Sequence, residues 1–168
     1  MKTALFIGRF QPLHKAHLSD IMLALKEYDK IIIAVGSSQD SNTKENPFTF
    51  EERKGMIDKA LLANHISPYE IVAVPDINDD SKWVEHVKKI VPEFDVVYTG
   101  NDFTEQLFKE KNIKVVKIDL IPEISATEVR KRLFNGNKWK ELVPEQIKDY
   151  IKKIYGIDRL KKINNKLK

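Results

Sequence analysis

The chain of 168 residues contains no cysteine, no long apolar run and only six glycines. Without cysteine, disulfides, thiolate nucleophiles and cysteine-ligated zinc are excluded. No run approaches the roughly 20 apolar residues of a membrane span, and Arg9 interrupts the first apolar run before it can serve as a secretory signal. A Gly-rich loop ending in Lys-Ser or Lys-Thr, the signature of P-loop enzymes, is also missing. We therefore expect a cytoplasmic protein with no membrane contact.

The composition is that of a folded globular protein, with 42% hydrophobic and 32% charged residues. The length predicts one domain, residues 1–168, in which an α/β core (1–143) precedes a helical tail (144–168). The net charge is +4, and much of the excess lies in the tail, at Arg159, Lys161, Lys162, Lys166 and Lys168. A basic tail raises nucleic-acid binding as one hypothesis, although such runs are more often solvated, and the balanced remainder favours no nucleic-acid partner.

Short apolar runs recur along the chain and are separated by helical patterns. The runs are 3–7, 31–35, 71–74, 96–98 and 115–118, mostly β-branched and without alternation, as in parallel strands covered on both faces. Apolar residues at helical spacing occupy 18–25, 56–61 and 83–91. This order predicts an α/β fold: a Rossmann-like five-stranded parallel sheet with helices on both faces.

The tail has its own helical pattern. Pro144 fits the first position of a helix whose apolar stripe runs from Ile147 to Tyr155. Gly156 is expected to end that helix, and Asp158 to cap a short final helix with Leu160, Ile163 and Leu167 on its apolar face. We expect the tail to pack on the sheet domain or on a neighbouring subunit.

The segment that follows the first strand carries the strongest functional signal. Gly8, Arg9 and Phe10 open a turn, and His14 and His17 lie three residues apart where the next helix begins. A helix N-terminus attracts anions, and residues three apart share one helical face. Two imidazoles and a guanidinium on this turn favour a polyphosphate over a carboxylate.

A second helix start with phosphate-suited side chains lies late in the chain. Ser125 and Glu128 match a capping box, which alone explains both residues. Thr127 and Arg130 go beyond capping, because they place a hydroxyl and a planar guanidinium at the same helix start. Two such helix starts predict separate sites for the reacting phosphate and the remaining phosphates of a nucleotide.

These two motifs together resemble a known superfamily. The Gly8-Arg9-Phe10-x-Pro12-x-His14-x-x-His17 turn and the Ile124-Ser125-x-Thr127-x-x-Arg130 helix start resemble those of the nucleotidyltransferase α/β phosphodiesterase superfamily. Residues 45–53, 75–78 with Trp83, and 136–144 are similar to segments of archaeal-type nicotinamide mononucleotide (NMN) adenylyltransferases. The chain departs from the family at Ala16, where a glycine is usual.

The resemblance implies adenylyl transfer from ATP to NMN, which yields NAD and pyrophosphate in NAD biosynthesis. It also implies Mg²⁺ accompanying ATP, no protein-held metal, and a homo-oligomer, possibly a hexamer. The implied catalytic residues are His14, His17, Arg9 and Arg130. The implied ATP-binding residues are Gly8, Arg9, Phe10, His14, His17, Gly100, Asn101, Ser125, Thr127 and Arg130. The implied NMN-binding residues are Arg53, Asp76, Ile77, Asn78 and Trp83.

Several alternatives remain open at this stage. The same architecture serves FAD synthetases, cytidylyltransferases and phosphopantetheine adenylyltransferases, and an inert nucleotide-sensing relative would share it. The preference between NMN and nicotinate mononucleotide is not fixed by the sequence. Arg53 can bind a phosphate or pair with Glu51 or Glu52, and Trp83 belongs to an apolar helix face as well as to the implied NMN site. Asp76, Asp79 and Asp80 are better explained by helix capping than by a metal site.

Overall fold

A computed structural model describes residues 1–136 and 138–166 and divides the chain into two compact units. Unit 1 comprises Met1–Arg9, Asp20–Ser38 and Ile66–Leu120. Unit 2 comprises Phe10–Ser19, Gln39–His65 and Ile121–Lys168. The chain thus passes between the units repeatedly, and each unit is assembled from segments far apart in the sequence.

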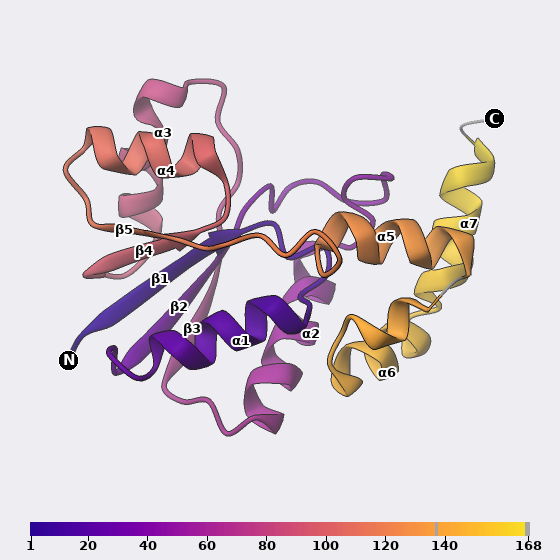
Figure 1. Cartoon of the computed structure of the whole chain (residues 1–168). Helices are drawn as coiled ribbons and strands as arrows, with labels where there is room; N and C mark the ends of the chain where they lie inside the picture. Colours follow the sequence, from indigo (N-terminus) through magenta and orange to yellow (C-terminus); the bar gives the residue numbers. More distant parts are fainter. Residues whose placement is uncertain (137, 167–168) are drawn as a thin grey trace. The chain divides into compact units, whose positions relative to one another are not determined.

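Unit 1 is built on a five-stranded sheet, as predicted (Figure 1). Its strands are β1 (Thr3–Gly8), β2 (Lys30–Val35), β3 (Tyr69–Ala73), β4 (Val96–Thr99) and β5 (Val115–Lys117). All neighbours are parallel, in the order β3-β2-β1-β4-β5. The strand order reverses between β1 and β4: from β1 the sheet grows in one direction through β2 and β3, and in the other through β4 and β5. In open parallel sheets, ligands bind at this kind of position.

Helices cover both faces of this sheet. On one face, Leu5 and Ile7 of β1 share a core with Val87 of α3 (Asp80–Ile90) and Phe108 of α4 (Asp102–Glu110). The C-terminal half of α1 (Lys15–Ala24) lies on the other face in Figure 1, with Ile21 fully buried. Because both faces are covered, the strands need apolar side chains in both directions, which explains their unbroken apolar runs.

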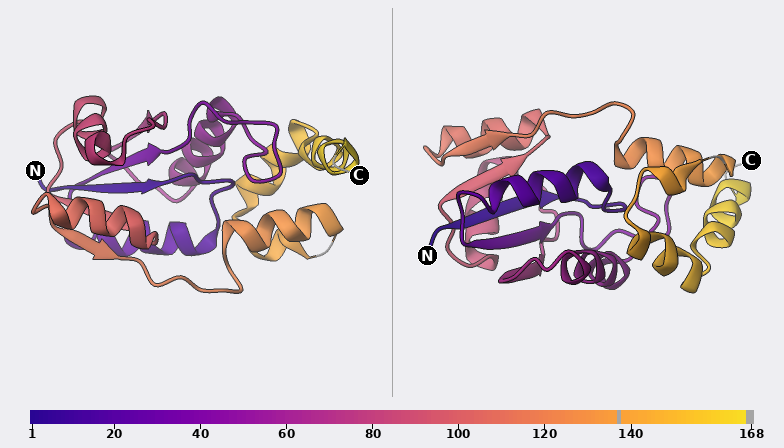
Figure 2. Two further views of the ribbon diagram at one scale, coloured as in Figure 1. Left: turned by 90° about the horizontal axis from the view of Figure 1, so that it is seen from above. Right: turned by 60° about the horizontal axis from the view of Figure 1, so that its bottom comes forward.

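Unit 2 is mostly helical. Its elements are the first part of α1, α2 (Phe50–Ala63), α5 (Ala126–Asn135), the short 3₁₀ helix η1 (Trp139–Glu141), α6 (Glu145–Lys153) and α7 (Gly156–Lys166). Helix α6 packs against α2 and α7, and α7 also packs against α5. Both views in Figure 2 show α5, α6 and α7 grouped together. Among the described residues, no helix is long and apolar enough to cross a membrane.

The helix starts follow from local signals. Helix α1 begins at Lys15, so His14 and His17 lie where this helix begins, as predicted. Helix α2 begins at Phe50, because Thr49 and Glu52 form a complete capping box there. Helix α4, which the sequence reasoning missed, begins after Asn101, whose side chain caps it.

The tail helices are shifted from their predicted ends. Pro144 is the N-cap of α6 rather than its first residue. Gly156 begins α7 instead of only ending the preceding helix, so Asp158 lies inside the first turn and is not the cap. Leu167, predicted on the apolar face, lies outside the described residues.

Candidate active site

The turn that carries the histidines, residues 10–17, belongs to unit 2. Phe10 adopts a left-handed backbone conformation with φ of 50°, an uncommon choice for a residue with a side chain. Its ring is buried and lies 4.8 Å from the ring of His17, centroid to centroid. The strained backbone at Phe10 is thus accompanied by a packed aromatic contact that supports His17.

His14 and His17 form one interlocked pair. Their rings stack with centroids 3.6 Å apart. The backbone N–H of each residue donates to Nδ1 of the other, both at 3.3 Å. Because each Nδ1 accepts, each neutral ring carries its proton on Nε2. The pair therefore presents two Nε2–H donors, the arrangement expected for binding phosphate oxygens.

Both histidines are held in the neutral form. Burial lowers the pKa of His14 to about 4. Burial, and then the proximity of His14, lower the pKa of His17 well below its usual range. At neutral pH these rings therefore act as hydrogen-bond donors and not as fixed cations.

The second predicted motif lies in the same unit as the histidine turn. Ser125 caps α5, and its hydroxyl accepts from the Glu128 N–H at 3.1 Å, while the Glu128 carboxylate pairs with Arg132 at 2.8 Å. Arg130 is buried, and its Nη2 donates to the Thr127 hydroxyl at 3.2 Å. This contact joins the two residues that capping alone did not explain.

Arg130 is joined directly to the histidine turn. Its Nη1 donates to the backbone carbonyl of Gln11 at 3.0 Å, across 119 residues of sequence. The two motifs singled out in the sequence are therefore in contact within unit 2. Gln11 was not among the predicted residues, and nothing in its immediate sequence signals this contact.

Arg53 is fully buried on α2. Its Nε donates to the Thr49 carbonyl at 3.3 Å. Glu52, one of its two predicted ion-pair partners, accepts from the Thr49 N–H and pairs with Arg159 of α7 at 2.8 Å. The Glu52 carboxylate is thus engaged by α7 and by the helix cap.

The remaining predicted residues belong to unit 1, at the carboxyl ends of its strands. Gly8 ends β1, and its carbonyl accepts from the Gly36 N–H at 2.8 Å, directly after β2. After β4, Asn101 uses its side-chain oxygen to cap α4 at Thr104, 2.9 Å away. Arg9 directly follows Gly8, and Gly100 directly precedes Asn101.

The implied NMN loop, Pro75–Asn78, follows β3 in unit 1. His86 of α3 lies 2.9 Å from the Pro75 carbonyl through Nε2, which holds the loop to the helix. Trp83, in the first turn of α3, packs edge-to-face on Phe108 with centroids 5.8 Å apart. Asp79 caps α3 through the Ser81 N–H, as the capping interpretation predicted.

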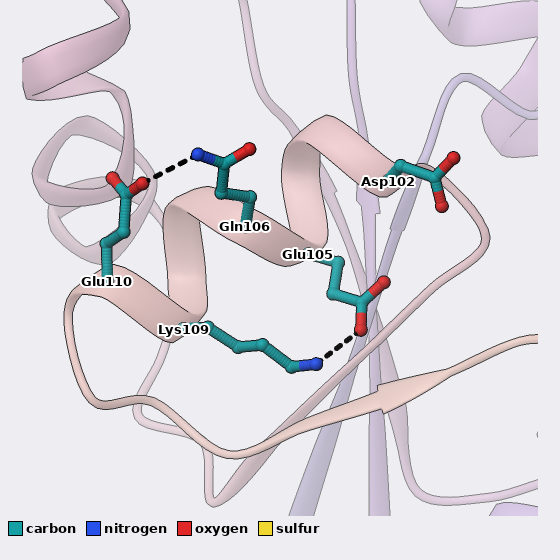
Figure 3. A pocket seen from close by; sticks show the side chains of 5 residues that line it. All are labelled: Asp102, Glu105, Gln106, Lys109 and Glu110. Carbon is teal, nitrogen blue, oxygen red and sulfur yellow. Dashed lines mark hydrogen bonds and ion pairs between the residues drawn. The ribbon is translucent and has the colours of Figure 1, made fainter.

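A hollow of about 440 Å³ lies elsewhere in unit 1, along α4 (Figure 3). It is lined by Asp102, Glu105, Gln106, Lys109 and Glu110. Lys109 pairs with Glu105 at 2.6 Å, and Gln106 donates to Glu110 at 2.8 Å. These two pairs link residues one turn apart, as on an ordinary solvated helix face, while Asp102 pairs with Lys117 of β5. None of the five lining residues is a predicted site residue.

Comparison with known proteins agrees with the family resemblance. Residues 5–132 match the cytidylyltransferase-like family. The nicotinamide-nucleotide adenylyltransferase of Pyrococcus furiosus is 41% identical over 99% of this chain and 92% of its own length. That of Methanococcus vannielii is 45% identical over 97% of this chain and 95% of its own length.

A solved structure gives the same result for the fold. It is a bifunctional NMN adenylyltransferase/ADP ribose pyrophosphatase from Francisella tularensis, complexed with AMP and a Mn ion, which matches with a TM-score of 0.79 and 28% identity. The match covers 98% of this chain but only 53% of the bifunctional protein, so this chain spans about half of that length. Because these relatives match nearly the whole chain and the fold is the same, the chain belongs to the nicotinamide-nucleotide adenylyltransferases of the cytidylyltransferase-like family.

Proposed function

We infer that this protein transfers the adenylyl group of ATP to NMN, forming NAD and releasing pyrophosphate. The names of its full-length relatives support this reaction. The structural observation that carries it is the contact of Arg130 with the Gln11 carbonyl, because it joins an arginine at one helix start to the histidine pair at another. In this proposal the triphosphate of ATP engages both groups.

The proposed chemistry is a single in-line displacement. A 5′-phosphate oxygen of NMN forms a bond to the α-phosphorus of ATP, and the bond from that phosphorus to the bridging oxygen of the β-phosphate breaks. The attacking oxygen is anionic near neutral pH, so no strong base is needed and positioning with charge stabilisation supplies most of the catalysis. Pyrophosphate takes the electron pair of the broken bond.

The roles in unit 2 follow from donor chemistry. The Nε2–H groups of His14 and His17 bind oxygens at the α-phosphorus, and they donate without giving up a proton because both rings are neutral. Ser125, Thr127 and Arg130 bind the departing pyrophosphate, since a guanidinium fork matches phosphate oxygens. Phe10 supports His17 through its ring contact.

The roles in unit 1 follow from loop positions. Gly8 and Arg9, directly before the histidine turn, bind phosphates of ATP. Gly100 and Asn101 contact adenosine. Asp76, Ile77 and Asn78 border the nicotinamide ring, and Trp83 stacks on it. The Phe108 contact of Trp83 and the His86 contact at Pro75 support this assignment, because they hold the ring and the loop in fixed positions. Arg53 of unit 2 is assigned to the NMN phosphate.

Mg²⁺ is proposed to enter with ATP. In the part of the chain that the structure describes, no group of three or more His, Asp or Glu side chains could hold a metal ion. In this proposal the ion is coordinated mainly by triphosphate oxygens and water. Bound in that way, Mg²⁺ neutralises phosphate charge, while the side chains named above orient the substrates.

The state of the protein in the cell is a further proposal. We place it in the cytoplasm as a homo-oligomer, with a hexamer as the form that the family resemblance implies. Exposed apolar side chains on unit 2, such as Leu62 and Tyr155, are available for subunit contacts. Light scattering of the purified chain gives the subunit number, and a monomeric mass would overturn this part of the proposal.

The deciding experiment measures pyrophosphate release from ATP and Mg²⁺ with a panel of acceptors. The panel contains NMN, nicotinate mononucleotide, FMN and phosphopantetheine, and each product is identified by mass. We expect release with NMN and formation of NAD; the rate with nicotinate mononucleotide then defines the base preference. Release only with FMN or phosphopantetheine would retain the chemistry but overturn the substrate. No release with any acceptor would favour a nucleotide-binding role without catalysis.

A further inference from the structure

Gln11 is a fully buried polar residue near the start of the histidine turn. Both halves of its side-chain amide bond to the backbone of one residue 37 positions away. Its Nε2 donates to the Phe48 carbonyl at 2.9 Å, and its Oε1 accepts from the Phe48 N–H at 3.0 Å. A buried amide that loses such partners pays a desolvation cost, so this pairing fixes the Gln11 side chain in one orientation.

Phe48 is itself a rigid anchor. Its side chain is fully buried, and the next residue, Thr49, begins the complete capping box of α2 with Glu52. The guanidinium of Arg159 lies 5.8 Å from the centroid of the Phe48 ring. The Gln11 amide therefore binds to a backbone segment that is held by a helix cap and by α7.

The main chain of Gln11 connects this anchor to the phosphate machinery. Its carbonyl accepts from Arg130 Nη1 at 3.0 Å, while Arg130 Nη2 donates to Thr127 at 3.2 Å. The direction of this carbonyl depends on the orientation of the peptide that the side chain pins. A tilt of that peptide would move the guanidinium relative to His14 and His17, which lie three and six residues further along the same turn.

We propose that Gln11 is a positioning residue for adenylyl transfer: its side chain locks onto the Phe48 backbone, and its carbonyl thereby aims Arg130 at the departing pyrophosphate. This inference rests on the proposed function. Gln11 itself touches no substrate in this account and acts through Arg130. The competing explanation is that the Gln11–Phe48 pair only stabilises unit 2.

Two substitutions separate positioning from stability. Gln11→Met keeps the approximate volume and removes both amide hydrogen bonds. Gln11→Glu keeps an acceptor for the Phe48 N–H but replaces the donor with a carboxyl oxygen that faces the Phe48 carbonyl. We expect kcat to fall roughly 10- to 100-fold for both variants, since small displacements of positioning groups cost this much. The KM for NMN should stay within about twofold, because the NMN side is not aimed by this carbonyl.

The matched control is Ile151→Val, a fully buried position of α6 in the same unit. We expect this substitution to lower the melting temperature and, because Ile151 lies outside the turn of residues 10–17, to leave kcat unchanged. A double-mutant cycle supplies the second test: in an Arg130→Ala background, Gln11→Met should cause little further loss, whereas independent effects would multiply. Unchanged kcat in both Gln11 variants, a rise confined to the KM for NMN, or multiplicative losses would overturn the proposal.

Binding of inorganic pyrophosphate, measured by calorimetry, keeps this inference separate from the reaction itself. We expect Gln11→Met to weaken binding about tenfold and to have no further effect once Arg130 is alanine. If the wild-type protein forms no NAD but this binding pattern holds, the proposed function fails and the positioning role stands. If NAD is formed and pyrophosphate affinity is unchanged by Gln11→Met, the positioning role is wrong.

Discussion

At the scale of single residues, the histidine pair shows how burial defines a chemical role. His14 and His17 could each have been a surface residue near a helix start, but their rings stack and each accepts the other's backbone N–H. Burial keeps the pKa of both rings below the neutral range. The result is a pair of fixed, uncharged donors whose geometry depends on both members.

His17→Ala is the first test of this role. We expect kcat for NAD formation to fall on the order of 10²- to 10³-fold, the usual loss when a transition-state donor is removed. The fold should persist, as judged by circular dichroism and thermal melting. His65→Asn is the control: His65 is exposed and has φ of 56°, a conformation that asparagine tolerates. Near-normal turnover of His17→Ala would contradict the assignment of the pair.

Trp83 serves both core packing and, as proposed, nicotinamide stacking. Because its ring contacts Phe108, alanine would also disturb the core, so Trp83→Phe is the informative substitution. We expect the KM for NMN to rise several-fold and the KM for ATP to change little, as measured by initial rates. Phe94→Leu is the control, since Phe94 also packs on Phe108, at 6.3 Å, and is not a predicted site residue. Equal changes in both KM values would argue for a packing role alone.

Asp20 gives a pH-dependent prediction. Burial, together with the charge of Asp119, raises the pKa of Asp20 to about 6 from an ordinary 3.8. The folded state thus binds this proton more tightly than the unfolded state, so ionised Asp20 destabilises the fold above pH 6 and has no effect below pH 3.8.

Asp20→Asn should therefore raise the melting temperature at neutral pH. The gain should shrink as the pH falls through 6 and disappear toward 3.8. Thermal melting across this pH range measures the gain in melting temperature. Glu85→Gln, at an exposed position, is the control, and it should leave the melting temperature unchanged. A constant gain at every pH would show that the charge of Asp20 is not responsible.

At the scale of elements, local sequence signals predicted most of the architecture. Unbroken apolar runs identified all five strands, because both faces of the sheet are covered. The missed helix α4 had a signal in Asn101, but that residue was interpreted only as a nucleotide contact, and in the structure it is also a cap. The Gln11–Phe48 pairing could not have been predicted, because a side chain that binds a backbone 37 residues away leaves no periodic pattern.

The packing of α6 on α2 depends on Gly55, a glycine that no sequence pattern singled out. A Cβ added at Gly55 would lie 2.3 Å from the Tyr150 hydroxyl and 2.7 Å from two ring carbons. We expect Gly55→Ala to destabilise the protein by about 1–3 kcal/mol, the usual cost of overpacking, despite alanine's better helix propensity. Urea unfolding measures the loss. Tyr150→Leu in the same chain should restore part of it, and Lys54→Ala on the exposed face should have little effect.

At the scale of the whole molecule, the chain crosses between its two units five times, after residues 9, 19, 38, 65 and 120. No linker composition marks these crossings, so the division could not be predicted from sequence. Each unit contains predicted site residues: the histidine pair and Arg130 belong to unit 2, and the Pro75–Asn78 loop and Trp83 belong to unit 1. The motifs that identify the family are therefore concentrated in unit 2, where the structure places them in contact.

Substitutions in the basic tail test whether the protein binds nucleic acid in addition to acting as an enzyme. Deleting α7 would be a poor test, because Arg159 pairs with Glu52 at the start of α2. Reversing the charge of Lys161, Lys162 and Lys166 is cleaner, since all three are exposed. We expect the triple Lys→Glu variant to form NAD within about twofold of the wild-type rate, because no predicted site residue lies among them.

The same variant should also leave nucleic-acid binding unchanged, because we expect no measurable binding of duplex DNA by the wild-type protein. Fluorescence anisotropy at two salt concentrations measures this, since binding through lysines weakens steeply as salt rises. Arg159→Met provides the contrast: it leaves the three lysines in place, removes the pair with Glu52 and should lower the melting temperature. Tight, salt-sensitive DNA binding by the wild type that the triple variant loses would instead assign the tail a nucleic-acid role alongside the enzyme.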